Sequence, residues 1–90
     1  MQESKEKIFY LNKLLGKVFR ETRELNTKLS CNKAEEEFGI SRGGLNRLEN
    51  GKVDPTFSTI WKASEATGKK LSEIIYAVEQ LLDEDFSLTD

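Results

Sequence analysis

The middle of the chain is divided by residues that begin and end short helices. Ser30 and Ser41 are good N-cap residues, because a serine oxygen accepts a hydrogen bond from a free backbone N–H of the first helical turn. Gly39 follows an apolar position and can take the left-handed conformation that ends a helix, and Asn50-Gly51 can end the next one. The pattern therefore predicts two short helices joined by a three-residue turn, over 31–38 and 42–49.

Apolar residues at three- and four-residue spacings predict one long amphipathic helix before this pair and another helix near the end of the chain. The first covers 4–26, with Leu11 and Leu15 on its apolar stripe. The last covers 71–83 and carries a continuous apolar stripe from Leu71 to Leu82. A short acidic tail follows it.

A further helix is predicted between the short pair and the last helix. Pro55 keeps the residue before it extended, and Thr56 can cap the helix that follows. This helix covers 57–67, and Gly68 ends it. Its buried side is expected to consist of Ile60, Trp61 and Ala63 to Ala66.

These elements predict an all-α fold with five helices, a central helix-turn-helix pair and an extended first helix. At 90 residues the chain has room for one domain of ordinary size. We expect residues 1–14 to form an N-terminal helical extension and residues 15–76 to form the domain. Residues 77–90 are expected to contain the end of the last helix, with a role in dimerisation, and the acidic tail.

The composition excludes several kinds of chemistry. The chain contains no His and one Cys, Cys31, so an intramolecular disulfide, the usual zinc sites and a Ser-His-Asp or Cys-His arrangement are excluded. It has no apolar run near the ~20 residues that a membrane span needs, and its N-terminus lacks the apolar core of a secretory signal. We therefore expect a cytoplasmic protein that is not an enzyme, holds no cofactor or metal and does not associate with a membrane.

Charge is distributed unevenly along the chain. Residues 1–52 carry 11 Lys and Arg against 8 Asp and Glu, whereas residues 53–90 carry 3 against 8. This asymmetry allows a surface that faces an anion on the first part and an acidic second part that would repel the same partner.

The most specific motifs in the middle of the chain are Gly39-Ile40-Ser41-Arg42 and Arg47-Leu48-Glu49-Asn50-Gly51-Lys52, supported by Leu29-Ser30, Phe38, Leu45 and Pro55. Together they resemble the Cro/phage-repressor family of helix-turn-helix regulators, also called Xre-type. The resemblance extends from about Leu15 to Ile75. It implies a repressor-like domain whose second short helix enters the major groove of double-stranded DNA, and a role in transcriptional regulation in a bacterium, phage or mobile element.

The candidate base contacts are Arg42, Asn46 and Arg47, because arginine can pair with guanine through two hydrogen bonds and asparagine with adenine. Helix N-termini at Ser30 and Ser41 present free N–H groups to the phosphate backbone. The full set of predicted phosphate contacts is Ser30, Asn32, Ser41, Gly43, Asn50, Lys52, Lys17 and Arg20, the last four as the resemblance implies.

Three residues or pairs depart from the family pattern. Glu35 stands where the family usually has a small residue, so its carboxylate must point sideways or find a partner. Cys31 replaces a glutamine that would donate to phosphate. Gly43-Gly44 weakens the first turn of the recognition helix and offers no side chain to a base. These glycines allow close approach of a sugar-phosphate chain or of the helix that carries Glu35, or the helix becomes firm only on binding.

A single short recognition helix reads only a few base pairs, so useful specificity requires two half-sites and a homodimer. The predicted dimer surface consists of Val78, Leu81, Leu82, Phe9 and Leu14. The chain is therefore expected to be a sequence-specific transcriptional regulator, a repressor, with a regulatory protein as a further partner. The alternative is a helix-turn-helix protein that binds another protein, as an antitoxin or an antirepressor partner does.

Overall fold

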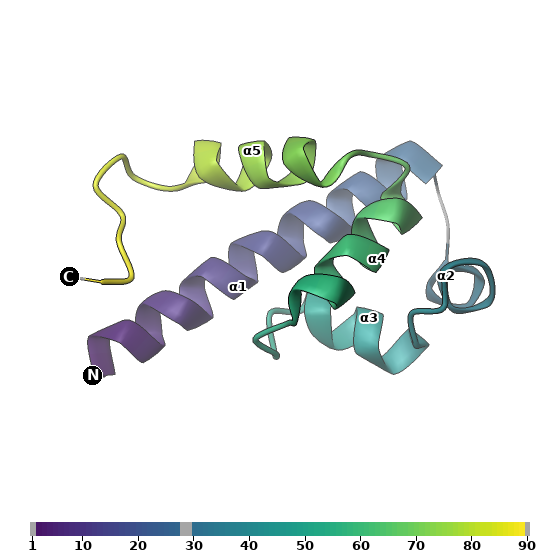
Figure 1. Cartoon of the computed structure of the whole chain (residues 1–90), viewed down its shortest axis with the longest axis horizontal. Coiled ribbons are helices and arrows are strands. Elements are labelled where there is room, and N and C mark those ends of the chain that lie inside the picture. The colour runs from purple at the N-terminus through teal and green to yellow at the C-terminus, as the bar shows by residue number, and fades with distance from the viewer. Residues whose placement is uncertain (1, 28–29, 90) are drawn as a thin grey trace.

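The structure is a computed structural model that describes residues 2–27 and 30–89, with the backbone alone for residues 2–4 and 31. The described residues form helices and no strand, which confirms the all-α prediction (Figure 1). The elements are α1 (Gln2–Thr22), a π-helical turn η1 (Arg23–Thr27), α2 (Cys31–Phe38), α3 (Arg42–Glu49), α4 (Phe57–Thr67) and α5 (Leu71–Leu81).

The helices α2, α3 and α4 begin and end at the predicted residues, because their caps form as expected. The Oγ of Ser30 accepts a hydrogen bond from the backbone N–H of Lys33 at 3.2 Å, and the Oγ1 of Thr56 accepts one from Thr59 at 3.3 Å. Gly39 ends α2 with φ 68° and Gly68 ends α4 with φ 75°. Short-range capping chemistry therefore determines these boundaries.

The two outer helices differ from their predicted limits. α1 begins at Gln2, earlier than predicted, and its π-helical continuation runs to Thr27. α5 ends at Leu81, earlier than predicted, because Leu82 is extended with ψ 151°. The acidic run that follows would place negative charge at the negative end of the helix dipole, which disfavours a longer helix.

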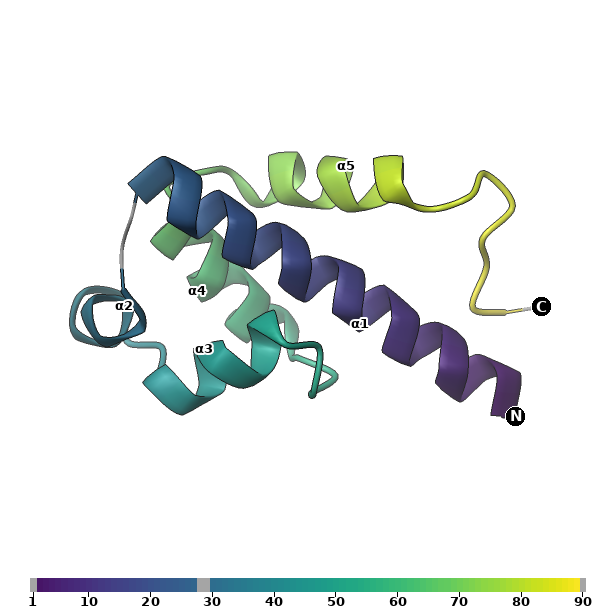
Figure 2. The ribbon, with the colours of Figure 1, turned by 180° about the vertical axis from the view of Figure 1, so that it is seen from behind.

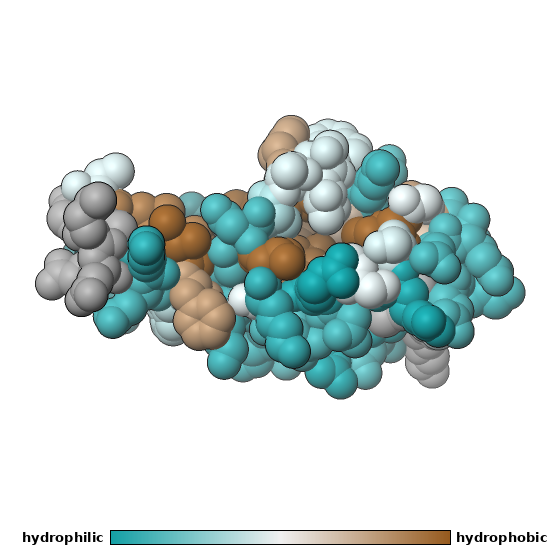
Figure 3. Space-filling model, turned by 90° about the horizontal axis from the view of Figure 1, so that it is seen from below, coloured by the Kyte–Doolittle hydropathy of each residue, from teal (hydrophilic) through white to brown (hydrophobic). Residues whose placement is uncertain are grey.

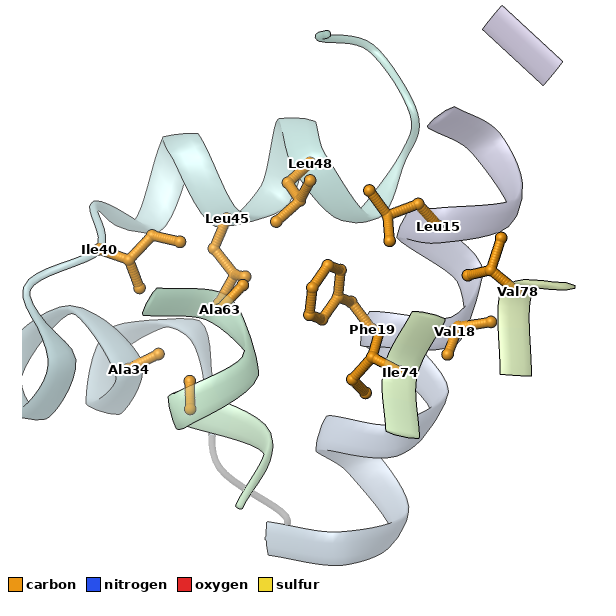
Figure 4. Close-up of a cluster of buried hydrophobic side chains, with 11 residues drawn as sticks. Leu15, Val18, Phe19, Ala34, Ile40, Leu45, Leu48, Ala63, Ile74 and Val78 are labelled. Atoms are coloured by element: carbon orange, nitrogen blue, oxygen red, sulfur yellow. The ribbon is translucent and has the colours of Figure 1, made fainter. Parts of the chain in front are cut away.

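The core lies between α1 on one side and α3, α4 and α5 on the others. α1 crosses the molecule diagonally, with α5 along one flank and α3 and α4 along the opposite flank (Figures 1 and 2). Phe19 of α1 is 1% exposed and packs among Leu45, Leu48 and Ile74 (Figure 4). Because α3 contributes two of these core residues, its orientation is fixed by the same packing that holds the domain together.

Gly16 lets α1 lie directly on the end of α3. A Cβ atom at this position would stand 2.6 Å from the carbonyl oxygen of Glu49 and closer still to that of Leu48. Nearby, the amide of Asn12 donates to the carboxylate of Asp54 at 3.1 Å and so attaches the loop after α3 to α1. Sequence reasoning missed both contacts, because neither has a local signal.

The predicted buried side of α4 is wrong at Trp61 and Glu65. Trp61 is 51% exposed, with its ring edge against Phe57 at a centroid distance of 6.0 Å. Ala63 and Ala66 take the positions that face the core, and each is 1% exposed. The successive residues of a helix point about 100° apart, so the apolar character of Trp61 does not bring it to the core side.

Described residues near both ends of the chain extend beyond the core. The N-terminal half of α1 and the segment after α5 project together at one end of the molecule (Figure 1). The rings of Tyr10 and Phe86 lie 6.2 Å apart, so the segment after α5 packs back on α1. Within the described residues, α1 is unbroken from this projecting end into the core.

Candidate nucleic-acid interface

The recognition helix α3 has one buried side and one exposed side. Leu45, Leu48 and Glu49 are buried, and Ile40 in the preceding turn is 5% exposed. The three predicted base contacts all lie on the exposed side, at Arg42, Asn46 and Arg47. Seen from the side of the molecule on which α3 lies, hydrophilic residues cover much of the surface, with hydrophobic patches between them (Figure 3). The structure therefore brings the candidate base contacts onto one polar, accessible surface.

Arg42 is joined to α2 by two contacts. Its Nη1 donates to the Oδ1 of Asn32 at 3.2 Å, and its backbone N–H donates to the Oε2 of Glu35 at 3.0 Å. Glu35 thus points sideways and finds a partner, as its unusual position requires. The predicted phosphate contact Asn32 and the predicted base contact Arg42 are neighbours in space.

The paired glycines at the start of α3 have close neighbours within α3 and its cap. A Cβ atom on Gly44 would stand 2.7 Å from the Oγ of Ser41, which accepts the Gly44 N–H at 3.0 Å. A Cβ atom on Gly43 would stand 3.2 Å from the Nη1 of Arg47, so this guanidinium lies over the Gly43 backbone. Gly44 therefore makes room for the cap, and Gly43 leaves room for the Arg47 guanidinium.

The C-terminal end of α3 is held by Asn50. Its Nδ2 donates to the backbone oxygen of Asn46 at 2.8 Å and to the Oδ1 of Asn46 at 3.2 Å. Asn50 thus acts as the predicted C-cap of α3, and its side chain also orients the side-chain amide of Asn46, one helical turn earlier. The backbone N–H of Lys52 donates to the oxygen of Arg47 at 2.9 Å, while its side chain is exposed.

The predicted phosphate contacts on α1 are exposed. Lys17 follows Gly16, which lies against the end of α3. Arg20 lies one turn after Gly16 and pairs with Glu24 at 3.3 Å. A phosphate at Arg20 would compete with that carboxylate, although an exposed pair of this kind is weak.

A buried ion pair between α3 and η1, the turn after α1, was missed by sequence reasoning. The Nε of Arg23 lies 2.7 Å from the Oε2 of Glu49, and its Nη2 lies 2.9 Å from the Oε1. The two side chains are 11% and 5% exposed. The sequence contains no local pattern that pairs Arg23 with Glu49. A signal that could have indicated the pair is the glutamate at the end of the otherwise apolar inward face of α3, because a buried carboxylate needs a cation opposite it.

Only some residues of the predicted dimer surface are exposed to solvent. Val78 is 4% exposed and belongs to the core, so its assignment to a dimer surface is wrong. Leu14 and Leu82 are partly buried and pack against the same core. Phe9 is 54% exposed and Leu81 is 47% exposed, so these two residues remain candidates. The last helix uses more of its apolar stripe within the monomer than the sequence indicates.

The described residues contain no group of three or more His, Cys, Asp or Glu side chains placed to hold a metal ion. Among the same residues, no helix is both long and apolar enough to span a membrane. The side chain of Cys31, one of the departures from the family pattern, lies outside the described residues.

Comparison with protein families matches residues 19–74 to the family described as helix-turn-helix. No curated protein and no solved structure matches the chain. The matched segment is more than half of the 90 residues and contains the whole of α2, α3 and α4. The chain therefore belongs to the Xre/Cro-type helix-turn-helix family and is a DNA-binding helix-turn-helix regulator.

Proposed function

We propose that the protein binds a specific sequence of double-stranded DNA as a homodimer and represses transcription by occupying that site. The proposal is supported chiefly by the structure of α3, which has one buried side and one exposed polar side. Leu45 and Leu48 anchor it in the core, while Arg42, Asn46 and Arg47 lie on the accessible surface. A helix held in this way can enter a major groove without unfolding any part of the core.

The roles of the polar residues follow from their chemistry. Arg42 and Arg47 can each pair with the O6 and N7 of a guanine, and Asn46 can pair with an adenine. Asn50 and Lys52, next along the chain, contact phosphates and set the register of α3 in the groove. The direct sequence code is narrow, because Gly43 and Gly44 offer no side chain to a base.

A homodimer would extend this code. Two recognition helices about 34 Å apart reach successive turns of the duplex on the same side, which doubles the number of base pairs read. Phe9 and Leu81, exposed on α1 and α5, are the apolar residues that we assign to the contact between copies. Occupancy of such a site in a promoter would exclude other proteins from it.

The proposal is tested by selecting bound duplexes from a random pool. We expect enrichment of a sequence with twofold symmetry, with half-sites separated by about one helical turn. If the bound duplexes show no enriched sequence at low salt, the protein binds DNA in general and the proposed sequence specificity is contradicted. Enrichment of a site without twofold symmetry would contradict the proposed homodimer.

A second candidate function is supported by the surface of α4 and α5. Phe57 is 69% exposed and Trp61 is 51% exposed, and Trp61 borders a groove of about 820 Å³ with Leu71 and Ile75. Exposed aromatic residues of this kind are enriched where proteins bind other proteins. The alternative is a module that binds an antirepressor or a toxin, and it predicts no binding to random duplex even at low salt.

A further inference from the structure

The N-terminus of the recognition helix is already occupied by acceptors from the protein itself. The backbone N–H of Arg42 donates to the carboxylate of Glu35, and that of Gly44 donates to the Oγ of Ser41. The next amide, on Leu45, donates to the backbone oxygen of Ser41 at 2.8 Å. Within the described residues, the amide of Gly43 is the one in this turn that has no acceptor. The helix end that would attract a phosphate is thus mostly satisfied internally.

The two caps offset the poor helix propensity of the glycines. Each glycine costs a helix on the order of 1 kcal/mol relative to alanine, so the first turn of α3 is weak by itself. A carboxylate at a helix N-terminus is favourable, because it meets the positive end of the helix dipole. Glu35 and Ser41 therefore hold together a turn that Gly43-Gly44 would otherwise loosen.

The same carboxylate opposes DNA. Glu35 is exposed, on the side of α2 that contacts the start of α3, beside Arg42. A backbone phosphate that approached the Arg42 amide would have to displace this carboxylate or lie next to it, and like charges repel. The penalty does not depend on the base sequence, because phosphates are present at every step of the duplex.

We propose that Glu35 is an internal competitor of DNA phosphate, which stabilises the recognition helix in the free protein and lowers its affinity for duplex DNA of any sequence. The inference rests on the proposed DNA-binding function and adds an affinity-setting residue to it. Glu35 therefore has opposite effects on two quantities: its contact with Arg42 stabilises the free recognition helix and weakens binding to DNA. A residue with a purely structural role would not weaken DNA binding.

The test compares Glu35→Gln with Glu37→Gln in titrations of a random duplex at several salt concentrations. Glutamine keeps an oxygen that can accept the Arg42 N–H but removes the charge. Glu37 is exposed and, two residues further along α2, points about 200° away from Glu35, so its variant makes the same change in net charge at a different place. Thermal unfolding of each variant, and of Glu35→Ala, reports the capping role.

We expect Glu35→Gln to bind the random duplex about three- to tenfold more tightly at low salt, and Glu37→Gln to bind nearly as the parent does. The plot of log affinity against log salt should become steeper for Glu35→Gln by up to about one ion. Glu35→Ala, which loses the acceptor, should melt at a lower temperature than Glu35→Gln.

Equal affinities for the parent and Glu35→Gln would overturn the inference while leaving DNA binding in place. An equal gain in both glutamine variants would overturn it too, because the effect would then come from net charge alone. If the parent binds no duplex at low salt, the proposed function itself fails, and this inference fails with it.

Discussion

Arg23 and Glu49 form a bidentate ion pair that joins the turn after α1 to the last residue of the recognition helix. The distances are 2.7 Å and 2.9 Å, and both side chains are largely removed from water. A buried charge that loses its partner costs far more than an exposed one, so each residue depends on the other. The position of α3 relative to α1 is therefore sensitive to either member of the pair.

We predict that Glu49→Ala lowers the free energy of unfolding by about 3–5 kcal/mol, because it breaks a buried bidentate ion pair by removing one partner. Urea unfolding followed by circular dichroism measures this change. A double variant, Arg23→Met with Glu49→Leu, should recover most of the loss. If Glu49→Ala unfolds at the same urea concentration as the parent, the pair does not hold the helices together.

Gly16 provides the second prediction. Glycine-to-alanine replacement there places a methyl group against backbone oxygens at the end of α3, which must move apart. Gly16→Ala should destabilise the fold by about 1–3 kcal/mol, as overpacking of a tight contact does. The matched control is Gly43→Ala, where the nearest atom is the movable end of Arg47 and the helix gains up to about 1 kcal/mol in propensity. Similar melting temperatures for the two variants would contradict the close contact of α1 with α3.

The third prediction concerns the different roles proposed for Arg47, which contacts a base, and Lys52, which contacts phosphate. Arg47→Ala should weaken binding to the selected site by about 1–3 kcal/mol and relax preference at one base pair. Lys52→Ala should weaken binding to all sequences alike and reduce the salt dependence by about one ion. Lys70→Ala, on the groove beside Trp61, serves as the control and should change neither quantity. Identical losses for Arg47→Ala and Lys52→Ala on selected and random duplexes would remove the distinction between base and phosphate contacts.

A fourth prediction concerns the contact between copies. Sedimentation at micromolar concentration should show a dimer for the parent and a monomer for Phe9→Ser with Leu81→Ser, at a similar melting temperature. Val78→Ala should lower the melting temperature and leave the dimer formed, because Val78 lies in the core. A parent that sediments as a monomer would contradict the dimer proposal.

The sequence predicts α2, α3 and α4 to the residue because their limits depend on caps within a few positions, such as Ser30 with Lys33. It predicts the polar side of α3 for the same reason, since the periodicity of a helix is local. Contacts between distant segments carry no such signal. Arg23 with Glu49, and Gly16 on the end of α3, arise only when α1 crosses α3.

The errors at Trp61 and Val78 share a cause. Both predictions rest on residue type and on the width of an apolar stripe, whereas the burial of a side chain depends on which neighbouring elements cover its side of the helix. Alanines fill the core side of α4, so Trp61 lies at the edge, and α1 covers α5 far enough to bury Val78.

Contact between the helix-turn-helix and DNA can be mapped through backbone amide chemical shifts as a duplex is added at low salt. We predict that the shifts concentrate in residues 30–52, on α2, the turn and α3, and that they vanish as salt is raised. Shifts centred on Phe57, Trp61 and α5, or no shifts at all, would contradict it.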